Sequence, residues 1–380
     1  MSEARRDDWD PRDTSILADQ RREYDQMRER CPVAYSEFMG WSLFRHEDIA
    51  GVLADADTYS NASRHLAIPN GMDPPTHGRY RAALEPNFTA AQMAKLEPHA
   101  RAIAVNLLGP LLSGDETEFM AGFAMPFVMK TLCSVLGWPE QHWECLGGWT
   151  HGSRQAAFSK DSAAGKALAS LFSEHVKINL AAHRSTPNDE TDATDRLLNT
   201  KVDGVPLDDD QIVSVLRNWA AGHGTVAAAL GNVVLHLAQE HELQDRLRRD
   251  PSLIPAAIEE ILRADGPLVA NRRTTTREVA IQDRVIPKGG TLSLMWIAAN
   301  RDPRVFDDAH AVKIERDAEP SMVWGQGIHV CMGASLARLE LRVAIEELLA
   351  HTKRFDFVAD APQRTMYPSN GLAVLPLRLG

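Results

Sequence analysis

The chain has 380 residues, of which 44% are hydrophobic and 24% charged, and its formal net charge is −11. This composition is ordinary for a globular protein, and the length permits either one large domain or two. The acidic balance argues against nucleic acid as a general partner.

The chain contains four cysteines, Cys31, Cys133, Cys145 and Cys331. They form no Cys-x-x-Cys pair, and their spacing predicts neither a disulfide framework nor a zinc site. We therefore expect reduced thiols and a cytoplasmic protein. The N-terminal stretch has no apolar segment, so we expect no signal peptide or membrane anchor. The longest apolar run, Val226 to Leu237, is too short to span a bilayer and predicts a buried helix.

Helical periodicity dominates the first half of the chain. We expect helices at Thr14–Arg30, His46–Ala54, Thr76–Phe88, Ala90–Ser113, Met120–Leu136, His142–Ala157 and Ser162–His183. Between the first two, Val33–Phe44 alternates around Gly40 and predicts a short hairpin. The segment Asn61–Pro75 is rich in Pro, Gly and Asn and predicts a loop.

The second half begins with a polar surface connection at Ser185–Asp195. Two or three helices are expected in Asp208–Leu247, another in Ile254–Ala264, and a last helix ending near His351. Val269–Ile297 predicts a small β region, and the tail alternates like terminal strands.

The stretch from Val323 to Gly333 reads Val-Trp-Gly-Gln-Gly-Ile-His-Val-Cys-Met-Gly and precedes the last predicted helix. Its first two glycines permit positive φ and a flat backbone. At a helix N-terminus, exposed N–H groups favour the thiolate of Cys331 over the thiol. A rigidly held thiolate suits a soft or borderline metal, and a single protein ligand leaves the other metal positions to a cofactor such as haem. A buried free cysteine in a turn is the alternative.

This loop closely resembles the haem-binding signature of the cytochromes P450, aromatic-Gly-x-Gly-x-His-x-Cys-x-Gly, with Trp324 where the family usually has Phe. The resemblance covers nearly the whole chain. It implies a mainly α fold with a small β-rich region, in a single P450 domain spanning residues 1–380. It also implies haem b (iron protoporphyrin IX) as cofactor, with Cys331 as the metal ligand.

Glu260 and Arg263 lie one helical turn apart and match the family's Glu-x-x-Arg pair. In the family this pair is buried and supports the haem loop with a third partner, usually an Arg. At the matching place this chain has His310, and we expect His310 or a water to substitute. A solvated ion pair is the alternative for the motif by itself.

His77 and Arg81 share one helical face, where two donors suit paired carboxylates. The family uses the matching residues to hold the haem propionates, and Arg273 and His329 match further propionate contacts. For each of them an exposed salt bridge is the alternative.

Ala221-Gly222-His223-Gly224-Thr225 lies inside a long apolar helix and resembles the family's oxygen-binding motif. The Thr225 hydroxyl is expected to return to the carbonyl of Ala221 and to widen the helix locally. The family's acid is absent, because Gly224 occupies its place. His223 is a candidate proton relay beside Thr225, and a packing role is the alternative.

The resemblance implies a haem-thiolate monooxygenase that inserts one oxygen atom from O2 into a small organic substrate, with a role in secondary metabolism. No Gly-x-Gly-x-x-Gly or Walker-type loop is evident, so electrons are expected from a ferredoxin and its NAD(P)H-dependent reductase. Arg338 and Arg342 are candidate docking charges, or else part of a solvated helix face. Candidate substrate-pocket segments are Ser63–Met72 and Leu268–Asn271.

Two alternatives stay open. The missing acid is compatible with oxidative (radical) coupling of aromatic substrates, or with the use of peroxide. A non-catalytic haem-based sensor or carrier belongs to a different functional class.

Overall fold

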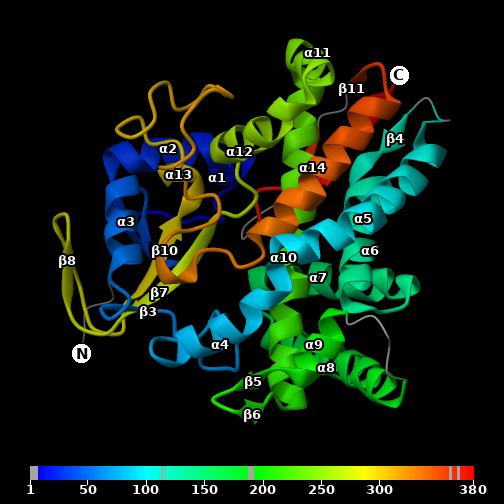
Figure 1. Cartoon of the computed structure of the whole chain (residues 1–380). Coiled ribbons are helices and arrows are strands. Elements are labelled where there is room, and N and C mark those ends of the chain that lie inside the picture. Colours follow the sequence, from blue (N-terminus) through cyan, green and yellow to red (C-terminus); the bar gives the residue numbers. More distant parts are fainter. Residues whose placement is uncertain (1–6, 113, 115, 187–191, 359–361, 366–368) are drawn as a thin grey trace.

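The computed structural model describes residues 7–112, 114, 116–186, 192–358, 362–365 and 369–380. Helices form the larger part of the molecule, and a small sheet lies to one side (Figure 1). The expectation of a mainly helical fold with a small β region is confirmed.

The N-terminal elements are α1 (Thr14–Ala18), α2 (Gln20–Arg30), β1 (Val33–Ser36), β2 (Gly40–Leu43), α3 (His46–Ala54), β3 (Tyr59–Ser60), α4 (Thr76–Leu84), η1 (Glu85–Phe88) and α5 (Ala90–Leu111). The prediction of one helix over Thr14–Arg30 is wrong. Asp19 has the non-helical angles φ −151° and ψ 79°, and its carboxylate accepts the N–H of Arg22. It therefore caps α2 and separates this helix from α1.

The middle of the chain is helical. Its elements are β4 (Thr117–Glu118), η2 (Met120–Ala124), α6 (Met125–Leu136), η3 (Glu140–His142), α7 (Trp143–Phe158), α8 (Ser162–Ser185), α9 (Ala193–Asn199), β5 (Lys201–Val202), β6 (Val205–Pro206) and α10 (Asp209–Gln239). The connection predicted at Ser185–Asp195 lies in part outside the described residues. Where it is described, it includes the end of α8 and the start of α9.

The C-terminal elements are α11 (His241–Arg249), η4 (Pro251–Leu253), α12 (Ile254–Ala264), β7 (Ala270–Thr275), β8 (Val279–Ile281), β9 (Arg284–Ile286), β10 (Thr291–Met295), α13 (Trp296–Ala299), η5 (Gly327–His329), α14 (Ala334–His351), β11 (Phe355–Phe357), β12 (Gln363–Arg364), β13 (Leu372–Val374) and β14 (Pro376–Leu379). The predicted helix over Ile254–Ala264 and the terminal strands are confirmed.

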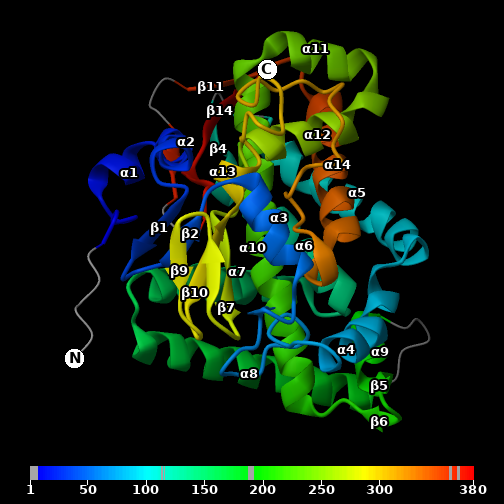
Figure 2. The same ribbon diagram turned by 90° about the vertical axis from the view of Figure 1, so that its left-hand side faces the viewer.

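The main sheet has the strand order β1-β2-β10-β7-β3. Its central strand β10 pairs in parallel with β2 and antiparallel with β7, beside which it lies in Figure 2. Leu292 and Leu294 of β10 are fully buried, which holds the sheet against the rest of the fold. The register also sets Arg273 of β7 opposite Leu292, and so fixes the place of a side chain that matters below.

Helix α10 runs through the centre of the helical part (Figure 1). It begins with a capping box, in which Asp208 and Gln211 satisfy each other's backbone N–H groups. It packs against α6, α8, α12 and α14, so most of its side chains are buried. The helix is unbroken across Gly222 and Gly224. Within the described part of the chain, no helix combines the length and apolarity needed to cross a membrane.

Candidate active site

A cavity of about 590 Å³ lies between α10, α14 and the loop that precedes α14. Its size is typical of a small-molecule site. Cys331 and Leu336 line it from the loop and α14, and Thr225 and Ala229 line it from α10. Both predicted pocket segments contribute to the wall, through Ser63, Pro69, Asn70, Gly71, Leu268 and Asn271.

The loop before α14 has a conformation that its glycines permit. Gly325 and Gly327 have φ of 70° and 71°, in the left-handed region that disfavours other residues. A Cβ on Gly327 would also lie 2.5 Å from the carbonyl oxygen of Leu53. The N–H of Cys331 donates to the carbonyl of Trp324 at 2.8 Å, which closes the loop and leaves the thiol in the cavity wall.

The expected preference of Cys331 for the thiolate does not follow from the loop by itself. Burial raises the pKa of the Cys331 thiol, while the N–H of Gly333 and the charges of Arg81 and Arg338 offset only part of that effect. The desolvation that disfavours the anion outweighs the helix terminus. A cation bound to the sulfur would reverse this balance, because metal coordination deprotonates a thiol.

The contacts of Trp324 show how the loop accommodates Trp at the position where Phe is usual. Its indole N–H donates to Glu259 of α12 at 2.8 Å, and the guanidinium of Arg338 lies 4.9 Å from its ring centroid. Glu259 also accepts from Arg338 at 2.7 Å. The three side chains thus join α12, the loop and α14.

A group of hydrogen-bond donors lies at the edge of the cavity near the loop. The rings of His77 and His329 are 4.2 Å apart, and Arg273 donates to Asn61 at 3.1 Å. Burial lowers the pKa of His329 to about 3. Arg81 donates to the loop carbonyls of Ile328 and Val330 at 3.0 and 2.7 Å, and its guanidinium group also pairs with Glu85.

These residues fit a flat, anionic cofactor. Arg273 is buried and has no carboxylate within salt-bridge distance among the described residues. The Nδ1 atom of His329 is buried and has no partner in the described chain. A buried guanidinium without a carboxylate and a buried ring nitrogen without a partner are costly unless a polar group meets them, and carboxylate groups are suitable partners. With Cys331 in the same wall, the donor set suits the iron and acidic groups of haem.

On α10, His223 and Thr225 both line the cavity, whereas Gly224 faces α7. The expected bond of Thr225 to Ala221 is not found. The hydroxyl of Thr225 accepts from Arg154 of α7 at 3.4 Å. His223 shares a hydrogen bond with the carbonyl of Trp219 at 2.8 Å, so its ring is fixed along the helix.

Comparisons with known proteins settle the family. Residues 154–379, more than half of the chain, match the family model for cytochrome P450. The chain is a cytochrome P450. It is 33% identical over 352 residues to cyclomarin C epoxidase CymV of Salinispora arenicola, with 87% of this chain and 88% of that protein covered. It is 31% identical over 344 residues to the erythromycin C-12 hydroxylase of Saccharopolyspora erythraea, covering 86% of each.

Solved structures agree with this assignment. A mutant of P450 EryK in complex with erythromycin B has a TM-score of 0.87 and 28% identity, with 95% of this chain and 96% of that chain covered. As a P450 related to an epoxidase and a hydroxylase, the protein is a monooxygenase-type oxidoreductase that uses haem. Such P450s bind small substrates and take electrons from separate redox partners.

The hydrogen-bonded cluster around Glu260 and Arg263 differs from the prediction. Glu260 accepts from Arg263 at 2.7 and 2.9 Å and from Arg316 at 2.9 Å. Arg316 is therefore the third partner, and the expectation that the Arg is missing is wrong. His310 contacts Arg301 and Asp25 instead.

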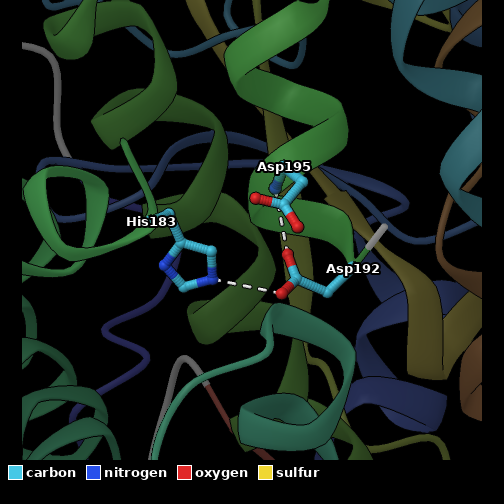
Figure 3. A group of neighbouring side chains, drawn as sticks. All are labelled: His183, Asp192 and Asp195. Atoms are coloured by element: carbon cyan, nitrogen blue, oxygen red, sulfur yellow. Dashed lines mark hydrogen bonds and ion pairs between the residues drawn. The ribbon is translucent and has the colours of Figure 1, made fainter. Parts of the chain in front are cut away.

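A second cluster of acidic and imidazole groups lies away from the cavity. In Figure 3 the ring of His183 faces the carboxylate of Asp192, which lies beside Asp195. Asp192 caps α9 by accepting the N–H of Asp195 at 2.9 Å and contacts Nε2 of His183 at 3.1 Å. The other ring nitrogen meets the carbonyl of Asn179. These bonds give the cluster a structural role, joining α8 to α9.

Sequence reasoning missed two residues of this P450 site, Arg154 and Arg316, and it gave Glu340 no role. Glu340 lines the cavity and is fully buried. It left a signal, since it stands at helical spacing between Leu336 and Ala344 on the apolar face of α14.

Proposed function

We propose that this P450 inserts one oxygen atom from O2 into a small organic substrate of secondary metabolism, with electrons from a ferredoxin and its NAD(P)H-dependent reductase. We treat residues 1–380 as a single P450 domain. The observation that carries the proposal is the cavity itself, which has Cys331 in one wall and the Thr225 face of α10 in another. Its relatives are named as an epoxidase and a hydroxylase, both oxygen-inserting activities.

In this proposal Cys331 binds the iron of haem b, and His77, Arg81, Arg273 and His329 hold its propionates. When bound, the haem would supply the activation of dioxygen, and a thiolate ligand from Cys331 would favour cleavage of the O–O bond. Arg81 has a further task, because its bonds to the carbonyls of Ile328 and Val330 fasten the loop to α4.

Thr225 is proposed to direct a proton into the cavity. Its oxygen accepts from Arg154, so its own O–H is free to donate toward the space it lines. His223 is the second candidate for proton handling, and its place in the cavity wall supports that role. The apolar remainder of the wall, with Val226, Leu262 and Trp296, limits the access of water.

The docking role of Arg338 and Arg342 has weak support. Arg338 pairs with Glu259, and Arg342 pairs with Glu97 and Glu346. Both guanidinium charges are thus largely offset, and a ferredoxin would have to compete with these carboxylates.

The thiolate assignment is tested by the spectrum of the reduced, haem-loaded protein under carbon monoxide. We expect the red-shifted Soret band of thiolate-bound haem, and we expect Cys331→Ala to abolish it. Cys145→Ala is the matched control, because Cys145 is also a free cysteine but does not line the cavity. A band that survives in Cys331→Ala would overturn the proposal.

A second candidate reaction is the oxidative coupling of aromatic substrates, or peroxide use. The absence of an acid at Gly224 favours it, since the usual acid–alcohol pair is incomplete. Product analysis under isotopically labelled O2 separates the two reactions. Labelled product supports insertion of oxygen from O2, and a product without label supports coupling or peroxide use.

A further inference from the structure

A positive charge without a counter-charge lies between α7 and α10, beside the cavity. Arg154 of α7 is partly buried, and its Nη2 donates to the hydroxyl oxygen of Thr225 at 3.4 Å. Thr225 lines the cavity, so this long hydrogen bond brings the guanidinium group to within one side chain of that space. Among the described residues, no Asp or Glu lies within salt-bridge distance of Arg154.

The other buried arginines near the site are accounted for. Arg263 pairs with Glu260 at 2.7 Å. Arg273 has no carboxylate of its own, and the proposed haem propionates would supply one. Arg154 contacts α10 through Thr225 and not the group of donors proposed for the propionates, so the haem does not account for its charge.

Burial makes this arrangement costly. It lowers the pKa of Arg154, and no acidic side chain offsets the effect. A guanidinium group nevertheless stays protonated in proteins, so the cost of the buried charge falls on the folded protein without a ligand. The Nε and Nη1 atoms of Arg154 have no hydrogen-bond partner among the described residues, and neither atom is completely enclosed. Their N–H groups are therefore free to meet a molecule that enters.

Helix α10 offers this guanidinium no acid. The residue that faces it is Gly224, which has no side chain. A Cβ at Gly224 would collide with the Cγ2 methyl of Thr150 and would lie 3.0 Å from Nη2 of Arg154. The two helices are thus too close at this point for a larger residue, and a negative charge for Arg154 must come from a bound molecule.

We propose that Arg154 binds a carboxylate group of the substrate, and that this P450 acts on small organic acids. A guanidinium group presents paired N–H donors that match the two oxygens of a carboxylate. One positive charge balances one negative charge, which favours a carboxylate over a dianionic phosphate group. The rest of the substrate lies against the apolar part of the wall, with Val226 and Leu262. The binding half of this inference stands by itself, and its reaction half rests on the proposed monooxygenase function.

Calorimetric titration of the haem-loaded protein at neutral pH tests this recognition without turnover. The probes are straight-chain acids from hexanoic to dodecanoic acid and phenylalkanoic acids, each compared with the primary amide of the same skeleton. We expect an acid to bind at least about tenfold more tightly than its amide, because the amide lacks the charge that Arg154 meets.

Arg154→Gln should weaken binding of the acid by about tenfold and change binding of the amide little. Arg184→Gln is the matched control, since Arg184 is exposed and already pairs with Asp209, and it should keep the preference of the wild type. The proposal is overturned by an amide that binds as tightly as its acid, by a preference that survives in Arg154→Gln, or by the failure of every acid to bind.

Stability gives a second readout, which separates a binding role from a structural one. Arg154→Met removes the uncompensated charge and keeps an unbranched side chain, so its urea midpoint without ligand should be no lower than that of the wild type. A clearly lower midpoint would mean that the fold already compensates the charge, and would overturn the proposal. If acids bind through Arg154 but gain no oxygen, the monooxygenase proposal fails while the binding site stands. If acids and amides are bound and oxidised equally well, the binding site fails while the monooxygenase proposal stands.

Discussion

Glu260 shows how one buried carboxylate joins α12 to the segment that precedes the haem loop. It accepts from two guanidinium groups and from the backbone N–H of Lys313 at 2.9 Å. Arg263 in turn donates to the carbonyls of Asn300 and Ala309, so the charge is surrounded by donors on one side and its partner by acceptors on the other. A buried ion pair of this kind is tolerated because its remaining hydrogen bonds are satisfied.

Arg316→Ala should destabilise the protein by about 1–3 kcal/mol, because a buried carboxylate loses a charged donor. Urea unfolding followed by circular dichroism measures the change. His310→Ala is the control and should cost less than about 0.5 kcal/mol, since its side chain is 59% exposed and bonds elsewhere. Equal losses in the two variants would restore His310 as the third partner.

At the scale of elements, α10 and α7 fit together at Gly224. This glycine is needed for space, because α10 is an ordinary helix there and takes no special φ. The contact explains why an unfavourable helix former stands in the middle of a long helix.

Gly224→Ala should destabilise the protein by about 1–3 kcal/mol, since overpacking outweighs the higher helix propensity of Ala. Thr150→Ser removes the obstructing methyl and keeps the hydroxyl that bonds to Leu146, so it should restore stability when combined with Gly224→Ala. Thermal or urea unfolding of the single and double variants measures this coupling.

The control for Gly224→Ala and its double variant with Thr150→Ser is Gly148→Ala on α7, where an added Cβ meets nothing within 4 Å. It should stabilise the protein by up to about 1 kcal/mol. If Gly224→Ala were to stabilise the protein equally, the two helices would not be in tight contact at that point.

Prediction from sequence succeeded where the signal is local. The boundaries of α3 and α12 follow from hydrophobic periodicity, and the place of Cys331 follows from a loop and a helix that are adjacent in the chain. It failed where partners are distant. Arg316 is 56 residues from Glu260, and Arg154 is 71 from Thr225, so only folding brings them together. The break at Asp19 was missed because one capping side chain overrides a continuous periodic pattern.

For the whole molecule, several histidines are held neutral by burial. Burial lowers the pKa of His142, His175, His223 and His236. Below about pH 6.5 each of them binds a proton more readily in the unfolded chain than in the folded one. Unfolding then takes up protons, so the free energy of unfolding falls as the pH falls.

Two buried carboxyl groups also contribute to the pH dependence. Glu260, whose pKa is lowered, acts in the same direction as the histidines below about pH 4.5. Glu340, whose pKa is raised, acts in the opposite direction above about pH 4.5.

His175 allows this fall of the unfolding free energy at acid pH to be tested at a site away from the cavity. Its ring lies 4.7 Å from that of His142 and 5.5 Å from that of Trp138, and its Nε2 has no partner among the described residues. His175→Gln should therefore reduce the slope of unfolding free energy against pH between pH 7 and 5, by at most about 1.4 kcal/mol per pH unit. Urea titrations at several pH values measure the slope. His99→Gln, a change on the exposed side of α5, is the control, and a slope that falls equally in both variants would contradict the assignment to burial.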